Sequence, residues 1–102
     1  MIKVEFIYKT QTKDLEELME KFQLSADPKF ASTPSNIGID MFKQEEAEVT
    51  YIILDIYYNN KAEYEARTKF ERSLTEWNNI WFNKANKHEE VSVKVFEVLR
   101  KN

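Results

Sequence analysis

Residues 47–58, AEVTYIILDIYY, are apolar or aromatic along almost their whole length, with one acid, Asp55, set near the end. Side chains of a β-strand alternate between two faces, so this segment predicts a strand with apolar groups on both. A chain of 102 residues with one layer of helices can cover only one face of a sheet. The second face therefore needs a partner, a ligand or both.

Composition predicts one globular domain over residues 1–102. Hydrophobic residues make up 42% of the chain and charged residues 32%, with one Gly and two Pro, which excludes a disordered chain. Aromatic residues reach 14%, a high share for so small a protein. We expect some of these rings to lie in an interface or a pocket as well as in a core.

The charge pattern excludes several classes of protein. The net charge is -3 and no run of like charges stands out, which argues against a nucleic-acid partner. Without cysteine there is no disulfide, thiol nucleophile or thiolate metal site. The first ten residues alternate like a strand rather than a signal peptide, and no apolar stretch approaches the ~20 residues that span a bilayer. We expect a soluble, cytoplasmic protein with no membrane partner.

The segments around the long strand alternate between strand and helix patterns. Residues 2–9 predict a strand, and Thr12 or Asp14 is expected to cap a helix that runs to about Leu24, with Glu17 completing a capping box. The apolar residues of this helix share one face: Leu15, Leu18, Met19 and Phe22.

Two further strands follow from the next segments. Residues 25–36 contain two prolines and form a loop with room for a short extra turn. Residues 36–43 alternate, and the polar residues 44–46 predict a turn, so that this strand and 47–58 form a hairpin. Residues 91–99 predict the last strand.

A second helix is predicted from near Ala62 to residues 84–87, where lysines suit the negative end of its dipole. Its apolar residues, spaced four, four, three and four apart, form one continuous stripe: Ala66, Phe70, Leu74, Trp77 and Trp81. The element order is β-α-β-β-α-β, which predicts a ferredoxin-like α+β fold. Right-handed crossovers place both helices on one face of a four-stranded antiparallel sheet, with its strands in the order second, third, first, fourth.

The two faces of this sheet differ in composition. The residues predicted beneath the helices are nearly all aliphatic, whereas the opposite face mixes apolar, aromatic and charged groups. This uncovered face carries Lys3, Glu5, Ile7, Asp40, Phe42, Tyr51, Ile53, Asp55, Tyr57, Lys94 and Phe96. It is too apolar for water and too charged for a simple core. Two copies packed face to face meet both demands, so we predict a homodimer.

The chain resembles the dimeric α+β barrel superfamily, which includes antibiotic biosynthesis monooxygenase-like and NIPSNAP-like proteins. The likeness lies in the length, the element order, the long third strand and the tryptophan-bearing segment TEWNNIWF at 75–82. It spans the whole chain and is architectural. It implies a small apolar or aromatic ligand bound between helices and sheet, with cofactor-independent oxygenase-like or isomerase-like activity. The alternative is a non-catalytic protein whose sheet face serves only for oligomerisation.

The tryptophans of the second helix distinguish these two hypotheses. In the superfamily an aromatic residue on this helix often borders a pocket, so Trp77 and Trp81, with Phe70, are candidate pocket residues. The alternative is that the rings only pack in the core. A cavity lined by Trp77 or Trp81 together with polar groups would favour ligand binding, and a packed interior would exclude it.

The single histidine, His88, precedes the last strand. Haem-degrading members of the superfamily use an asparagine on the first strand, a tryptophan on the second helix and a histidine as iron ligand. The first strand here, IKVEFIYK, has no asparagine, which argues against haem degradation. We therefore predict no cofactor and expect His88 at the surface, while keeping it as a weak catalytic candidate.

Asp55 is the most notable acid. Desolvation between Leu54 and Ile56 would suit it to proton transfer, with Tyr51 or Tyr57 holding a phenolic substrate. Alternatively Asp55 pairs with a lysine of the uncovered face, Lys3 or Lys94, inside the dimer interface. Asp40 and Glu5 could join Asp55 around a cation, but their spacing resembles no metal-binding loop, so no metal site is predicted.

Overall fold

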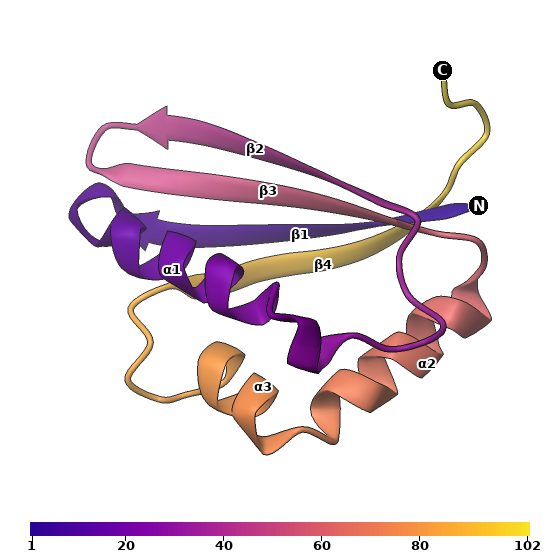
Figure 1. The fold of residues 1–102 in the computed structure, drawn as a ribbon. Helices are drawn as coiled ribbons and strands as arrows, with labels where there is room; N and C mark the ends of the chain where they lie inside the picture. Colours follow the sequence, from indigo (N-terminus) through magenta and orange to yellow (C-terminus); the bar gives the residue numbers. More distant parts are fainter.

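The computed structural model describes all residues, 1–102, and has a four-stranded antiparallel sheet with its helices on one face (Figure 1). None of the helices is long and apolar enough to cross a membrane. The elements in chain order are β1 (Ile2–Gln11), η1 (Thr12–Asp14), α1 (Leu15–Ser25), η2 (Pro28–Phe30), β2 (Gly38–Glu46), β3 (Val49–Tyr58), α2 (Lys61–Arg72), α3 (Thr75–Trp81) and β4 (Glu89–Glu97).

The strand order β2-β3-β1-β4 confirms the predicted ferredoxin-like α+β topology. The long strand β3 and the first strand β1 occupy the centre, and every neighbouring pair is antiparallel. The register places Asp40, Asp55, Glu5 and Lys94 in one row across the four strands. Between Ile7 and Tyr8 the pairing of β1 with β4 shifts, which leaves Val91 outside the regular ladder.

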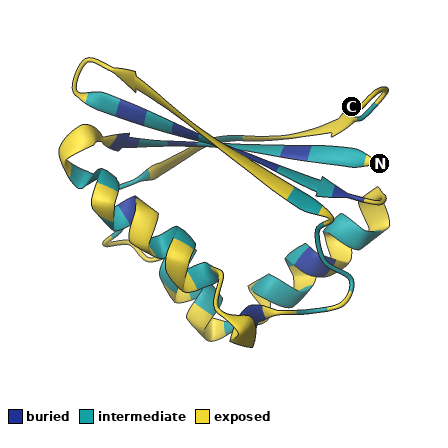
Figure 2. Cartoon of the chain, turned by 45° about the horizontal axis from the view of Figure 1, so that its top comes forward, coloured by how far each residue is buried: buried dark blue, intermediate teal, exposed yellow.

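The core is small and lies where α1 packs on the central strands. Tyr8, Leu18, Ile52 and Leu54 form it, and partly buried residues such as Phe22 and Trp81 pack against them. Only 11 of the 102 residues are buried. Figure 2 shows why: buried positions concentrate in β1 and β3, while the edge strands β2 and β4 are largely exposed. The helix layer covers one face incompletely, and no helix covers the other, where Lys101 Nζ lies 4.8 Å from the centre of the Tyr57 ring.

The predicted capping box at the start of the first helix is wrong. The side chain of Asp14 makes no capping hydrogen bond, and α1 begins at Leu15 after a short 3-10 turn. The reason is tertiary. The Thr12 hydroxyl lies 2.8 Å from the hydroxyl of Thr50 on β3, and the Asp14 carboxylate lies 3.6 Å from Lys87 Nζ. Both side chains are therefore engaged with distant parts of the chain.

The prediction of a single long second helix is also wrong, because this segment forms two helices, α2 and α3. Leu74 is extended, with φ −97° and ψ 117°, and separates α2 from α3. The Ser73 hydroxyl donates to the carbonyl of Phe70 at 2.6 Å, a local bond that competes with helix propagation. The apolar stripe predicted for one straight helix is consequently divided between α2 and α3. α2 turns polar residues inward, and α3 presents the tryptophans at a different angle.

The hairpin turn lies later than predicted, because residues 44–46 belong to β2. The connection is Ala47 and Glu48, and Ala47 has a positive φ of 56°. An alanine in this left-handed region is strained, whereas glycine adopts it freely.

Ala47→Gly is therefore expected to raise the free energy of unfolding by roughly 1 kcal/mol. Ala66→Gly provides the matched control, since Ala66 is an exposed residue in the interior of α2. There the same change should lower stability by about 1 kcal/mol. Urea unfolding followed by circular dichroism measures both. A loss of stability in Ala47→Gly would contradict the strain at the turn.

Candidate functional site

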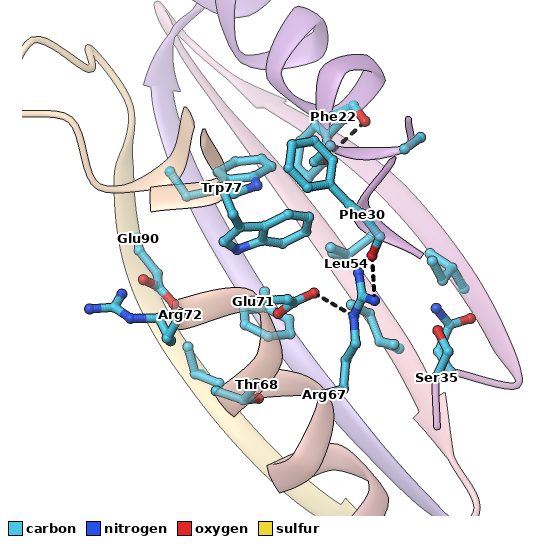
Figure 3. A pocket seen from close by; sticks show the side chains of 18 of the residues that line it. Phe22, Phe30, Ser35, Leu54, Arg67, Thr68, Glu71, Arg72, Trp77 and Glu90 are labelled. Carbon is cyan, nitrogen blue, oxygen red and sulfur yellow. Dashed lines mark hydrogen bonds and ion pairs between the residues drawn. The ribbon is translucent and has the colours of Figure 1, made fainter. Parts of the chain in front are cut away.

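A cavity of about 1000 Å³ lies between the helices and the covered face of the sheet. Its walls come from β1, β2, β3 and β4, from α1, α2 and α3, and from the loop at 25–36 (Figure 3). The aromatic side chains of the lining are Phe6, Tyr8, Phe22, Phe30, Tyr58, Tyr64, Trp77, Trp81, Phe82 and His88. Two of the three predicted pocket residues, Trp77 and Trp81, therefore line a cavity, together with polar groups.

The two tryptophans are held by aromatic neighbours from other elements. The ring of Trp81 lies 5.0 Å from that of Phe22 on α1 and 5.5 Å from that of Tyr8 on β1. Trp77 meets Phe30 edge to face at 5.3 Å. The indole N–H of Trp81 is buried and has no hydrogen-bond partner in the protein. A buried donor without a partner is costly, so Trp81 Nε1 is a polar group that a ligand could satisfy.

Arg67 anchors the loop at 25–36 to α2. Its side chain is buried and makes three hydrogen bonds (Figure 3). Nη1 donates to the Phe30 carbonyl at 2.6 Å and to the Ser32 hydroxyl at 2.7 Å, while Nε donates to Glu71 Oε2 at 2.9 Å. The guanidinium also faces the ring of Trp77 at 5.6 Å. These bonds use much of the donor capacity of Arg67 for structure.

Two carboxylates face the cavity from opposite sides, Glu71 from α2 and Glu90 from β4 (Figure 3). Burial raises the pKa of Glu71, and the ion pair with Arg67 offsets this only in part. Burial also raises the pKa of Glu90, against the opposing influence of Arg72. No protein group donates a hydrogen bond to Glu90, and Glu71 receives one only from Arg67.

Tyr8 and Tyr64 line the same cavity, and the charges of these two acids act on both phenols. Burial, then Glu90 and Glu71, raise the pKa of Tyr8 far above its ordinary value. Burial also raises the pKa of Tyr64, again with contributions from both glutamates. The phenols therefore remain protonated at neutral pH. We call this cluster, Glu71, Glu90, Tyr8 and Tyr64, the acidic end of the cavity.

The sequence led us to expect His88 at the surface, but the structure places it elsewhere. It lines the cavity, with its ring 5.8 Å from Tyr8 and 5.7 Å from Trp81, both edge to face. Its Nδ1 is buried and has no partner. Burial, and then the charge of Lys21, lower the pKa of the imidazole, so the ring is neutral at pH 7.

The other catalytic candidates lie on the opposite face of the sheet from this cavity. Asp55 is 8% exposed, and its Oδ2 forms an ion pair with Lys3 Nζ at 3.7 Å. Tyr51 and Tyr57 share its face by strand alternation and do not line the cavity. Phe70, the third predicted pocket residue, does not line it either; its ring faces the Arg67 guanidinium.

The polar groups of α2 were not among the site residues predicted from the sequence. Tyr64, Arg67, Thr68 and Glu71 share one helical face and line the cavity. Their spacing of three, one and three residues was visible in the sequence. A polar face is ordinarily the solvated one, however, so the pattern pointed outward. No group of three or more His, Asp or Glu side chains is placed to hold a metal ion.

Comparison with protein-family models and with curated protein sequences gave no match. Among solved structures, a dimeric ferredoxin-like protein from an uncultured marine organism has a TM-score of 0.76 and 13% identity, over 99% of this chain and 98% of that one. A mutant of MhuD with two manganese protoporphyrin IX molecules bound per active site has a TM-score of 0.69 and 14% identity, over 99% and 96%. The de novo designed protein Foldit4 has a TM-score of 0.58 and 13% identity, over 95% and 97%.

These likenesses establish the fold. The chain has a ferredoxin-like α+β architecture, which confirms the predicted resemblance to the dimeric α+β barrel superfamily at the level of fold. A designed protein shares the architecture, so the fold carries no function by itself. Any function must be argued from the cavity and the uncovered sheet face.

Proposed function

We propose that this protein binds a flat apolar or aromatic small molecule in the cavity between its helices and its sheet. The observation that carries the proposal is the cavity itself, about 1000 Å³ with Trp77 and Trp81 in its walls. Small-molecule sites are typically ~300–1,000 Å³, mostly apolar, with a few convergent polar groups. A purely structural helix layer would instead pack to native density and leave no such space.

The lining supports a planar ligand. Aromatic walls from α1, α3, β1 and the loop at 25–36 stack or meet rings edge to face, which adds about 0.5–1.5 kcal/mol per pair beyond area burial. Polar side chains of the lining, among them Thr68, Glu71 and Arg72, lie in the same cavity as these rings. Such a site binds a ring system with polar substituents.

An oxygenase-like reaction is the second candidate, and Glu71 favours it. A carboxylate whose pKa is raised by burial is a stronger base at neutral pH, and Glu71 lines the cavity. It would take the proton of an aromatic hydroxyl. The electron-rich phenolate would then reduce dioxygen, the balanced change being phenol plus dioxygen to quinone plus water.

A porphyrin fits the cavity residues less well. His88 would offer one neutral imidazole nitrogen to a metal, but the two arginines of the lining are balanced by two glutamates, so the cavity has no net positive charge to attract the carboxylates of protoporphyrin IX. The cavity-lining residues of β1 are Phe6 and Tyr8, and that strand has no asparagine. The porphyrin bound by MhuD therefore serves here as a probe rather than as the expected ligand.

The test is calorimetric titration with 1-naphthol, a two-ring phenol. We expect a Kd on the order of 10–100 µM, given its small number of atoms. Thr68→Trp places an indole in the cavity from α2 and should weaken binding at least tenfold. Thr75→Trp, at an exposed position at the start of α3, is the matched control and should bind as the wild type does.

Two results would overturn the proposal. One is the absence of 1-naphthol binding at millimolar concentration. The other is equal binding by both tryptophan variants, which would place the ligand elsewhere. A His88-dependent shift of the manganese protoporphyrin IX absorption band, without 1-naphthol binding, would indicate a porphyrin protein instead.

We also infer that the uncovered sheet face packs against a second copy of the chain. Phe42 and Phe96 are 52% and 41% exposed on this face. Charge complementarity supports the arrangement. The row across the sheet runs from Asp40 on edge strand β2 through Asp55 and Glu5 to Lys94 on edge strand β4, and Lys3 Nζ lies 3.7 Å from Asp55 and 3.9 Å from Glu5, the two central acids. A two-fold axis along the strands would bring Lys94 over the partner's Asp40.

A further inference from the structure

The two edge strands of the sheet, β2 and β4, carry unlike residues on the uncovered face. In each of three successive rows, a large or acidic residue on one edge stands level with a small or basic residue on the other. The pairing register aligns Phe42 with Ser92, Asp40 with Lys94, and Gly38 with Phe96. A two-fold axis along the strands places β2 of each protomer over β4 of the other. In this one register all three rows are complementary in size or charge.

Gly38 is the only glycine of the chain, and one protomer gives no reason for it. Its φ is not positive, and a Cβ at this position would lie 3.9 Å from Tyr57 Cδ2, an ordinary contact. A glycine in a strand leaves room for the close approach of another group. Phe96, 41% exposed on β4, is the large side chain that the two-fold axis brings over the partner's Gly38. The bare position therefore supports this register.

The segment 98–102 continues from β4 and leaves the sheet on the side opposite the helices (Figure 1). Its start is fixed, since the Val98 N–H donates to the carbonyl of Met1 at 3.0 Å. Leu99, the next residue, is 91% exposed, more than any other large apolar residue of the chain. This apolar side chain therefore stands on the side of the sheet where the second copy packs.

The segment is long enough to reach the edge of the partner's sheet. From Phe96 to Leu99 an extended chain spans about 10 Å, which is also the spacing of two sheets packed face to face. Leu99 can thus lie level with the partner's edge strand β2, where Ile37 and Ile39 are 50% and 52% exposed. Ile39 lines the cavity, as does Asn36. Within one chain the wall of the cavity is therefore open to solvent at this edge.

We propose that Leu99 of each protomer packs on Ile37 and Ile39 of its partner and so completes the β2 wall of the partner's cavity. This rests on the proposed dimer and the proposed ligand site, and adds a residue that the second copy supplies to that site. The physical reason is apolar burial, because three side chains that are each at least half exposed within one chain leave water together.

Disulfide formation between two variants tests the contact. The chain has no cysteine, so Leu99→Cys and Ile37→Cys, refolded together from urea, can crosslink only between protomers. After oxidation we expect a species of twice the 12.2 kDa chain mass, formed about tenfold faster than in the control mixture. The control pairs Ile37→Cys with Leu24→Cys, at an exposed leucine of α1. Leu99→Cys alone should also crosslink slowly, because the two-fold axis places the two copies of residue 99 at opposite edges of the interface.

Leu99→Ser tests the contribution to the cavity. With the dimer verified by light scattering, we expect the Kd of 1-naphthol to rise about threefold to tenfold, since an apolar group leaves the wall. Leu24→Ser removes an exposed leucine far from this edge and should leave the Kd unchanged.

Gly38→Leu tests the register by a second route. One chain has room for the new side chain, but the dimer does not, because the partner's Phe96 occupies that space. We expect the dimer Kd to rise about tenfold or more, with an unchanged circular dichroism spectrum. Adding Phe96→Ala to the same chain should recover part of the lost affinity.

The outcomes separate this inference from the proposals on which it rests. A wild type that is monomeric at micromolar concentration would overturn the dimer and this inference with it. A dimer in which residues 99 and 37 crosslink no faster than the control would overturn only the contact. Rapid crosslinking with an unchanged 1-naphthol Kd in Leu99→Ser would overturn the contribution to the cavity. If the wild type binds no 1-naphthol, the ligand site fails and the crosslinking rates still decide the contact.

Discussion

Replacing Arg67 by methionine should lower the free energy of unfolding by about 3–5 kcal/mol, a large part of the ~5–15 kcal/mol that stabilises a typical domain. The side chain is 9% exposed and holds two acceptors of the loop at 25–36 as well as Glu71. Methionine would fill part of the volume but leave the Phe30 carbonyl and the Glu71 carboxylate without their donor. Removing one partner of a buried ion pair costs more than the pair contributes.

Urea unfolding followed by circular dichroism measures the loss. Lys61→Met is the matched control, since Lys61 also precedes a glutamate by four residues on α2 but is 71% exposed in its side chain. That change should alter stability by no more than about 0.5 kcal/mol. Combining Arg67→Met with Glu71→Leu should recover most of the loss, because both ends of the buried pair become apolar. A loss in Arg67→Met no larger than in the control would contradict the anchoring role.

Phe42→Asp should convert the protein from a dimer into a monomer, raising the dimer Kd on the order of 100-fold or more. Phe42 lies on the uncovered face of edge strand β2, paired with Ile53, and is 52% exposed within one chain. An aspartate there is solvated in the monomer but would be desolvated and unpaired between two sheets. Such burial costs several kcal/mol, which is enough for this change in Kd.

Light scattering after size exclusion should give twice the 12.2 kDa chain mass for the wild type and the single mass for Phe42→Asp. Leu24→Asp makes the same kind of change at a position on α1 that is 58% exposed, and should remain dimeric. Unfolding curves should show that the Phe42→Asp monomer stays folded. A wild type that is monomeric at micromolar concentration would contradict the sheet-face dimer, as would a dimeric Phe42→Asp.

Strand alternation made much of the fold predictable. Residues 49–58 and 2–11 place alternate side chains on opposite faces whatever surrounds them, so the covered and uncovered faces follow from the order of residues. The element order then leaves few topologies, and the strand order β2-β3-β1-β4 is the predicted one. The tryptophans at 77 and 81, proposed from the sequence as pocket residues, line the cavity of the structure.

The acidic end of the cavity was not predictable in the same way. A polar helical face such as Tyr64, Arg67 and Glu71 is identical in sequence whether it meets water or a cavity. Its inward orientation depends on how α2 packs against the loop at 25–36, where Arg67 donates to the Phe30 carbonyl and the Ser32 hydroxyl. The position of His88 likewise follows from the aromatic neighbours it meets, Tyr8 and Trp81.

The sequence by itself determined the sheet, its two unlike faces and the need to cover the second one, because backbone alternation is a local property. Only the tertiary structure decided that a cavity remains beneath the helices and that Arg67, Glu71 and Glu90 line it. Those side chains meet groups distant in sequence, as Arg67 meets the carbonyl of Phe30, 37 residues away. Such long-range contacts depend on how whole helices and strands pack, and no local sequence pattern encodes them.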